Sequence, residues 1–124
     1  MTNDWVLWFD ARSPTCRRAL ELLRERGVEP VLRRHLEEPP TPGELAVLAW
    51  RLGLPVHGLC RTDEDEYQAL RLSPRTPDAE LLAALARHPR IVERPVLVRG
   101  ERAVLARPPE RVLDLLAEAA DPGL

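Results

Sequence analysis

The segment SPTCRR, Ser13 to Arg18, carries the clearest chemistry in the sequence. Serine followed by proline is a favoured pair at a helix start, because the serine oxygen accepts an orphan N–H and proline lacks that donor. Cys16 would then lie near the third helical position, where the helix dipole and the adjacent Arg17 and Arg18 would favour the thiolate form. The segment therefore indicates a candidate thiolate at Cys16, with buried packing as the alternative role.

Cys60 is the second of the two cysteines, and it directly precedes Arg61. A thiol there could resolve an intermediate formed on Cys16. Neighbouring residues of a helix point about 100° apart, however, so a packing role for Cys60 is the alternative. In a reducing cytosol both cysteines are expected to be thiols. The three histidines are scattered along the chain, so we expect no metal site.

The length and charge of the chain narrow the class of protein. Its 124 residues fit one domain, and its net charge of -2 gives no electrostatic reason to expect nucleic acid or an anionic membrane as partner. The sequence has no apolar run of membrane-spanning length and no signal-peptide pattern, so we expect a cytoplasmic protein. All eighteen basic residues are arginine, and none is lysine. This pattern indicates a genome-wide coding bias, so a functional role must be argued for each arginine separately.

Hydrophobic patterning predicts a buried strand at 5–9, a helix from Ser13 to Gly27 and a second strand within 28–36. A helix capped by Thr41 and Glu44 follows. The middle third predicts short helices near 56–59, 64–70 and 78–87. Strands at 95–98 and 103–105 form an expected hairpin, and a last helix begins at Pro108 and Pro109. The expected fold class is α/β: one domain over 1–124, ordered βαβ, a helical insertion at about 41–90, then ββα.

Three segments narrow this expectation to a family: EPVLRRHLEEPPTPGEL, LCRTDEDEYQAL and LARHPRIVERPVLVRGERAVLARPPERVLDLL. The order of elements resembles thioredoxin-like folds, and these segments resemble the glutaredoxin-linked arsenate reductases over nearly the whole chain. The resemblance implies a thioredoxin-like fold with a mixed four-stranded sheet.

The resemblance also implies an oxyanion site. In that family a cysteine at the first helix attacks arsenate, and three arginines that hold the anion correspond here to Arg61, Arg94 and Arg107. Guanidinium groups suit this task because each can pair with two oxygens. We add Arg17 as a further candidate ligand. The resemblance further implies that Pro95 is a cis proline, shaping the wall that faces Ser13 and Cys16.

The register of the first helix complicates the assignment of a nucleophile. The family places it fourteen residues before the glycine that ends this helix, and counting back from Gly27 reaches Ser13. Cys16 lies three residues later, so the chain reads SxxC. A serine oxygen cannot take oxidising equivalents from arsenic(V), whereas it can cap the helix or hydrogen-bond an anion. The family also has histidine and asparagine where this chain has Phe9 and Asp10. A carboxylate near an oxyanion is unfavourable unless a cation pairs with it, and Arg12 is the candidate partner of Asp10.

Three functions remain open from the sequence. The leading one is an arsenate reductase-like enzyme that binds arsenate or a similar oxyanion and reduces it through Cys16, with glutathione and glutaredoxin or thioredoxin as external reductant and no bound cofactor. The second is a catalytically impaired protein that binds arsenate or arsenite. The third is an Spx-like redox regulator.

Overall fold

The computed structural model describes residues 4–120, which divide into two compact units. One unit contains residues up to Arg34 and from Arg94 onward, and carries the sheet. The other, His35–Glu93, is built from helices. No helix within residues 4–120 is both long and apolar enough to cross a membrane.

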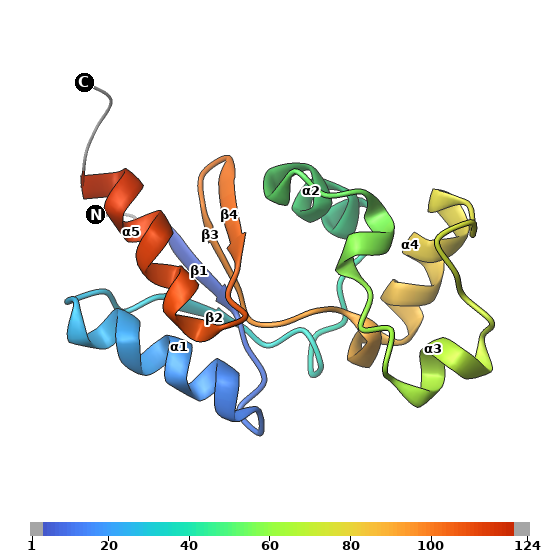
Figure 1. The fold of residues 1–124 in the computed structure, drawn as a ribbon, viewed down its shortest axis with the longest axis horizontal. Coiled ribbons are helices and arrows are strands. Elements are labelled where there is room, and N and C mark those ends of the chain that lie inside the picture. The colour runs from blue at the N-terminus through green and yellow to red at the C-terminus, as the bar shows by residue number, and fades with distance from the viewer. Residues whose placement is uncertain (1–3, 121–124) are drawn as a thin grey trace. The chain divides into compact units, whose positions relative to one another are not determined.

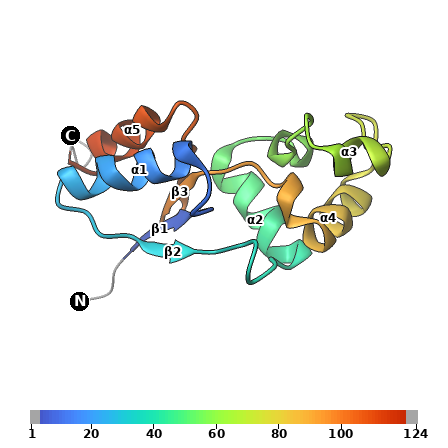
Figure 2. The ribbon, with the colours of Figure 1, turned by 90° about the horizontal axis from the view of Figure 1, so that it is seen from below.

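The sheet unit has a mixed sheet of four strands in the order β2-β1-β3-β4. Strand β1 pairs in parallel with β2 and antiparallel with β3, which also pairs antiparallel with β4. Figure 2 shows helices α1 and α5 on the same side of this sheet. The βαβ and ββα portions of the expected thioredoxin-like fold are therefore present. The elements are β1 (Trp5–Trp8), α1 (Pro14–Glu25), β2 (Val31–Arg33), β3 (Val96–Arg99), β4 (Arg102–Leu105), the 3-10 helix η3 (Pro109–Arg111) and α5 (Val112–Ala120).

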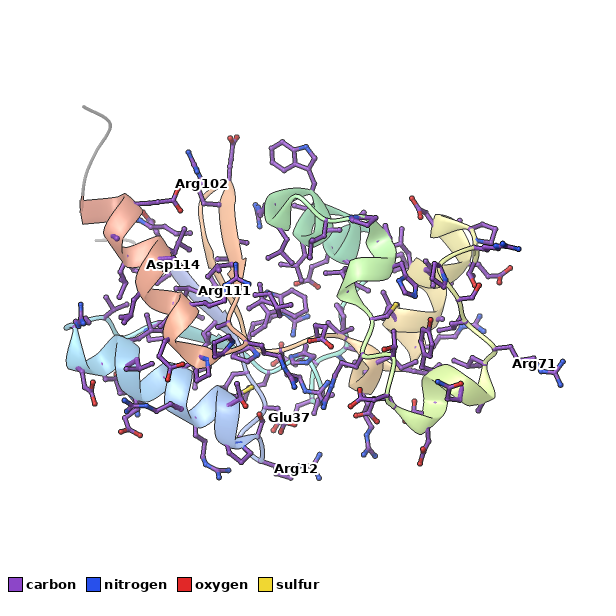
Figure 3. All side chains as sticks on the ribbon, viewed as in Figure 1. Arg12, Glu37, Arg71, Arg102, Arg111 and Asp114 are labelled. Atoms are coloured by element: carbon purple, nitrogen blue, oxygen red, sulfur yellow. The ribbon has the colours of Figure 1, made fainter. Side chains whose placement is uncertain are left out.

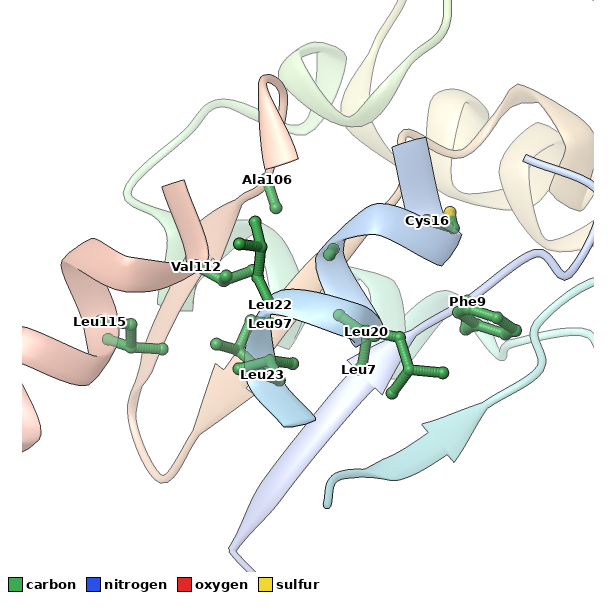
Figure 4. Packing of buried hydrophobic residues seen from close by; sticks show 11 residues of the cluster. Leu7, Phe9, Cys16, Leu20, Leu22, Leu23, Leu97, Ala106, Val112 and Leu115 are labelled. Atoms are coloured by element: carbon green, nitrogen blue, oxygen red, sulfur yellow. The ribbon is translucent and has the colours of Figure 1, made fainter. Parts of the chain in front are cut away.

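The core of this unit lies between the sheet and its two helices (Figure 4). Alternation along β1 turns Leu7 and Phe9 toward this side, where they meet the buried face of α1. Leu97 of β3 and Val112 and Leu115 of α5 complete the packing. The helix is thereby fixed on the sheet by side chains spaced along its whole length, and its N-terminus is held at the end of β1.

The helical unit contains the elements expected in the middle of the chain (Figure 1). Helix α2 packs against α4, and both contact the 3-10 helix η1. Thr41 caps α2 by accepting the Glu44 N–H at 3.1 Å. The bounds are α2 (Pro42–Leu52), η1 (Val56–Leu59), α3 (Asp65–Ala69), α4 (Asp78–Arg87) and the 3-10 helix η2 (Pro89–Ile91).

Three local details differ from the sequence-based expectation. The second strand is limited to Val31–Arg33. The hairpin turn contains two residues, Gly100 and Glu101, because Arg99 pairs with Arg102 within the sheet, and Gly100 takes the positive φ of 58° that such a turn requires. The last helix begins as η3 and becomes α-helical at Val112.

Candidate functional site

Helix α1 begins as its sequence indicates. Ser13 has extended backbone angles, and its Oγ accepts a hydrogen bond from the Cys16 N–H at 3.2 Å. Pro14 occupies the first helical turn and has no N–H to satisfy. The Thr15 N–H has no intrahelical acceptor, as at any second helical position. The half-buried Ser13 hydroxyl and this amide therefore lie together at the positive end of the helix dipole.

The Cys16 thiol belongs to the core. Its side chain is 0% exposed and is one of the residues packed between α1 and the sheet, with Phe9, Leu20 and Leu97 (Figure 4). The Cys16 N–H points to Ser13 at the helix end, while the thiol is on the buried face. An in-line attack on an anion needs a sulfur that the anion can approach. In this conformation Cys16 has no such access to solvent.

Arg94 and Asp10 form a buried ion pair beside the start of α1. Arg94 is 5% exposed, and its Nε lies 3.6 Å from Oδ2 of Asp10, whose side chain is 13% exposed. The Asp10 carbonyl oxygen accepts the Ser13 N–H at 3.0 Å. Asp10 therefore connects the helix cap to the buried guanidinium. The expected partner Arg12 is also present, with its Nε 3.8 Å from Asp10 Oδ1, but its side chain is 81% exposed (Figure 3).

The other candidate arginines of this unit are exposed. Arg17 donates from Nη1 to the Ala11 carbonyl oxygen at 2.9 Å, and its side chain lines an open hollow of about 570 Å³ along α1. Arg107 lies just after β4. The peptide bonds after Arg94 and after Arg107 are both cis, at Pro95 and Pro108. Pro95 thus has the geometry expected for it, and the cis bond at Pro108 was not predicted.

Arg61 belongs to the helical unit. Its backbone N–H donates to the Ile91 carbonyl oxygen at 2.6 Å, which ties the segment after η1 to η2. Its Nη1 lies 3.4 Å from Glu64 Oε1. Its Nε is shielded from solvent and has no hydrogen-bond acceptor among residues 4–120. Arg61 therefore retains a donor that the described part of the chain does not use.

Cys60 is also buried, at 6% exposure, and neither cysteine is in a disulfide. Burial, together with the negative charge of Glu93, raises the pKa of the Cys60 thiol to about 11. The thiol is therefore protonated near neutral pH. Because thiol chemistry proceeds through the thiolate, Cys60 has neither the charge nor the exposure of a reactive cysteine.

Sequence reasoning recognised Asp10 as a departure from the family pattern but not as the partner of Arg94. The contact joins residues from opposite ends of the sequence, and only the pairing of β1 with β3 brings them together. An acidic residue at a strand end, just before a helix, was the available signal. Among residues 4–120, no three His, Cys, Asp or Glu side chains lie close enough together to hold a metal ion.

The sequence of this chain matches a known protein family and several named proteins. The ArsC family model matches residues 10–115. An arsenate reductase of Haemophilus influenzae is 31% identical over 113 residues, which cover 90% of this chain and 97% of the relative. An arsenate reductase of Escherichia coli is 36% identical over 118 residues, covering 94% of this chain and 84% of the relative.

A solved structure described as an arsenate reductase from Vibrio cholerae is similar to this one with a TM-score of 0.86 and 36% sequence identity, covering 89% of this chain and 95% of that one. The fold is thus the α/β, thioredoxin-like fold of these reductases. The chain belongs to the ArsC family, and the two relatives described above are named arsenate reductase.

Proposed function

We propose that this chain binds arsenate or a closely related tetrahedral oxyanion at the N-terminus of α1, and that it lacks an accessible thiol nucleophile of its own. The observation that carries this proposal is the orientation at SxxC. The serine hydroxyl is at the helix end, whereas the Cys16 thiol is 0% exposed in the core.

Support for anion binding comes from the donors that this end of the helix presents. The Ser13 hydroxyl and the Thr15 N–H lie at the positive end of the dipole, which favours an anion by about 0.3 to 1 kcal/mol at an exposed site. The buried Arg94 guanidinium is linked to this end through Asp10. By correspondence with the family, Arg107 of the same unit is a further ligand of the anion.

The chemistry argues against reduction by the protein alone. Reduction of arsenic(V) to arsenic(III) transfers two electrons, and in a thiol-linked reaction these come from sulfur. Ser13 cannot supply them, and its ester with arsenate would release arsenate unchanged on hydrolysis. Cys16 would have to leave the core before it could attack, which would expose the sheet surface that α1 covers.

An Spx-like regulator is not favoured by any specific observation. A Cys16 reductase remains the competing function, because the named relatives are arsenate reductases. Glutaredoxin or thioredoxin would then be its partner. In the proposed function, no such reductant is needed.

Titration calorimetry with arsenate tests the binding claim. We expect saturable binding by the wild-type protein and at least a tenfold loss in Arg94→Met, since charge-assisted hydrogen bonds to an anion are worth about 1.5 to 3 kcal/mol. The matched control is Arg102→Met, which removes the same charge from a surface pair with Glu118, at 2.6 Å. Equal losses in both variants, or no binding by wild type, would contradict the proposal.

A further inference from the structure

The carboxylate of Asp10 is an unusual neighbour for an anion site. It lies 3.6 Å from the Arg94 guanidinium, and the same residue accepts the Ser13 N–H through its carbonyl oxygen. Any anion that reaches both the helix end and Arg94 therefore comes close to a negative charge. The Asp10 side chain is largely buried, so water screens this repulsion poorly.

Repulsion by a carboxylate depends on whether the ligand carries a proton. An ionised carboxylate only accepts hydrogen bonds, so a ligand oxygen without hydrogen faces it unfavourably. A ligand O–H can instead donate to it, giving a short charge-assisted hydrogen bond. Arsenate and phosphate each retain at least one proton at neutral pH, whereas sulfate and selenate retain none.

We propose that Asp10 is a specificity-determining residue that admits protonated tetrahedral oxyanions, such as arsenate and phosphate, and rejects fully ionised ones, such as sulfate and selenate. This inference rests on the proposed function, because it concerns the same site. Arg94 supplies attraction for both classes of anion, and Asp10 supplies the difference between them. Discrimination of this kind arises from an element that repels the wrong ligand.

A purely structural role for Asp10 is the competing explanation. Its Oδ1 accepts the Arg12 N–H at 3.0 Å, which fixes the turn before α1. Asp10→Asn separates the two roles, since an amide oxygen can accept the same hydrogen bond while the charge is removed. In addition, the amide N–H₂ can donate to an oxygen of sulfate.

The experiment is calorimetric titration of the full chain with sodium arsenate, phosphate, sulfate and selenate at pH 7 and constant ionic strength. We expect wild type to bind arsenate and phosphate at least about tenfold more tightly than sulfate and selenate. Asp10→Asn should reduce this ratio about tenfold, mainly through tighter binding of sulfate and selenate. The wild-type comparison needs no variant and is independent of any effect of the substitution on folding.

The outcomes separate the two claims. If wild type binds sulfate as tightly as arsenate, the role of Asp10 is refuted while oxyanion binding stands. If the Asp10→Asn ratio equals that of wild type, the selectivity has another source and the inference is again refuted. If wild type binds none of the four anions, the proposed function fails, and the role of Asp10 fails with it.

Discussion

The Ser13 Oγ accepts the Cys16 backbone N–H at 3.2 Å, so one helical turn holds a hydroxyl at the helix end and a thiol in the core. In the proposed function, this relationship explains why a member of the ArsC family would bind an oxyanion without reducing it. The N-terminus of α1 presents a hydroxyl oxygen, and the sulfur nearest to it in sequence is packed in the core.

Replacing Ser13 by cysteine should create reductase activity. A thiol at this position would have the helix N-terminus beside it, which lowers the pKa of a cysteine and raises its thiolate fraction. We expect arsenate-dependent turnover in the Ser13→Cys variant at least about tenfold above wild type, measured by NADPH oxidation coupled to glutathione and glutaredoxin, and in parallel to thioredoxin.

The matched control for this assay is Ser13→Ala, which should remain inactive and lose about 1 kcal/mol of stability with the helix cap. Wild-type turnover equal to that of Ser13→Cys would show that a thiol at position 13 is not required.

Substitutions at Cys16 should affect stability. Cys16→Ala leaves a small cavity in a fully buried site, and we expect a loss of about 1 kcal/mol in the free energy of unfolding. Cys16→Ser places a hydroxyl among apolar side chains and should cost more, about 1 to 3 kcal/mol. Urea denaturation followed by circular dichroism measures both. An unchanged stability in Cys16→Ser would show that the thiol is not packed as described.

Cys60 should make stability depend on alkaline pH. Its folded pKa is raised to about 11 from an ordinary value of 9.0, so the folded state holds this proton longer than the unfolded chain does. The resulting contribution is fully present below about pH 9 and is lost as the pH rises toward 11. We expect wild type to lose more stability between pH 8.5 and 10.5 than Cys60→Ala does, by about 1 to 2 kcal/mol.

Tyr67 must be considered in the same experiment, because burial raises its pKa as well, with a smaller contribution from Cys60. Because Cys60 contributes to the raised pKa of Tyr67, the cysteine is isolated by comparing Tyr67→Phe with the double variant Tyr67→Phe, Cys60→Ala. Parallel pH profiles for the two proteins would refute the assignment.

The hydrogen bond between His57 Nε2 and the Tyr67 hydroxyl, at 2.7 Å, should stabilise the helical unit. Tyr67→Phe keeps the ring but removes the hydroxyl, and we expect a loss of about 1 kcal/mol. His57→Ala with Tyr67→Phe completes a double-mutant cycle in thermal or urea unfolding. A coupling energy near zero would show that this contact contributes no net stability.

The sequence predicted most of the elements because their signals are local. Ser13 with Pro14, and Thr41 with Pro42, mark helix starts through a hydrogen bond within one turn. The direction of the Cys16 thiol was harder to predict, because it depends on which face of α1 lies on the sheet. The Asp10 to Arg94 contact was out of reach of any local pattern, since strand pairing creates it. The assignment of Arg61, Arg94 and Arg107 as oxyanion ligands stays a prediction.

The most direct test of the central claim is calorimetric titration of arsenate into Cys16→Ala, with folding verified by circular dichroism. If the oxyanion site is formed by the helix end and its arginines without the thiol, the variant should bind arsenate with a Kd within about twofold of wild type. Loss of arsenate binding in a folded Cys16→Ala protein, while wild type binds, would contradict this claim. It would show that Cys16 takes part in arsenate binding.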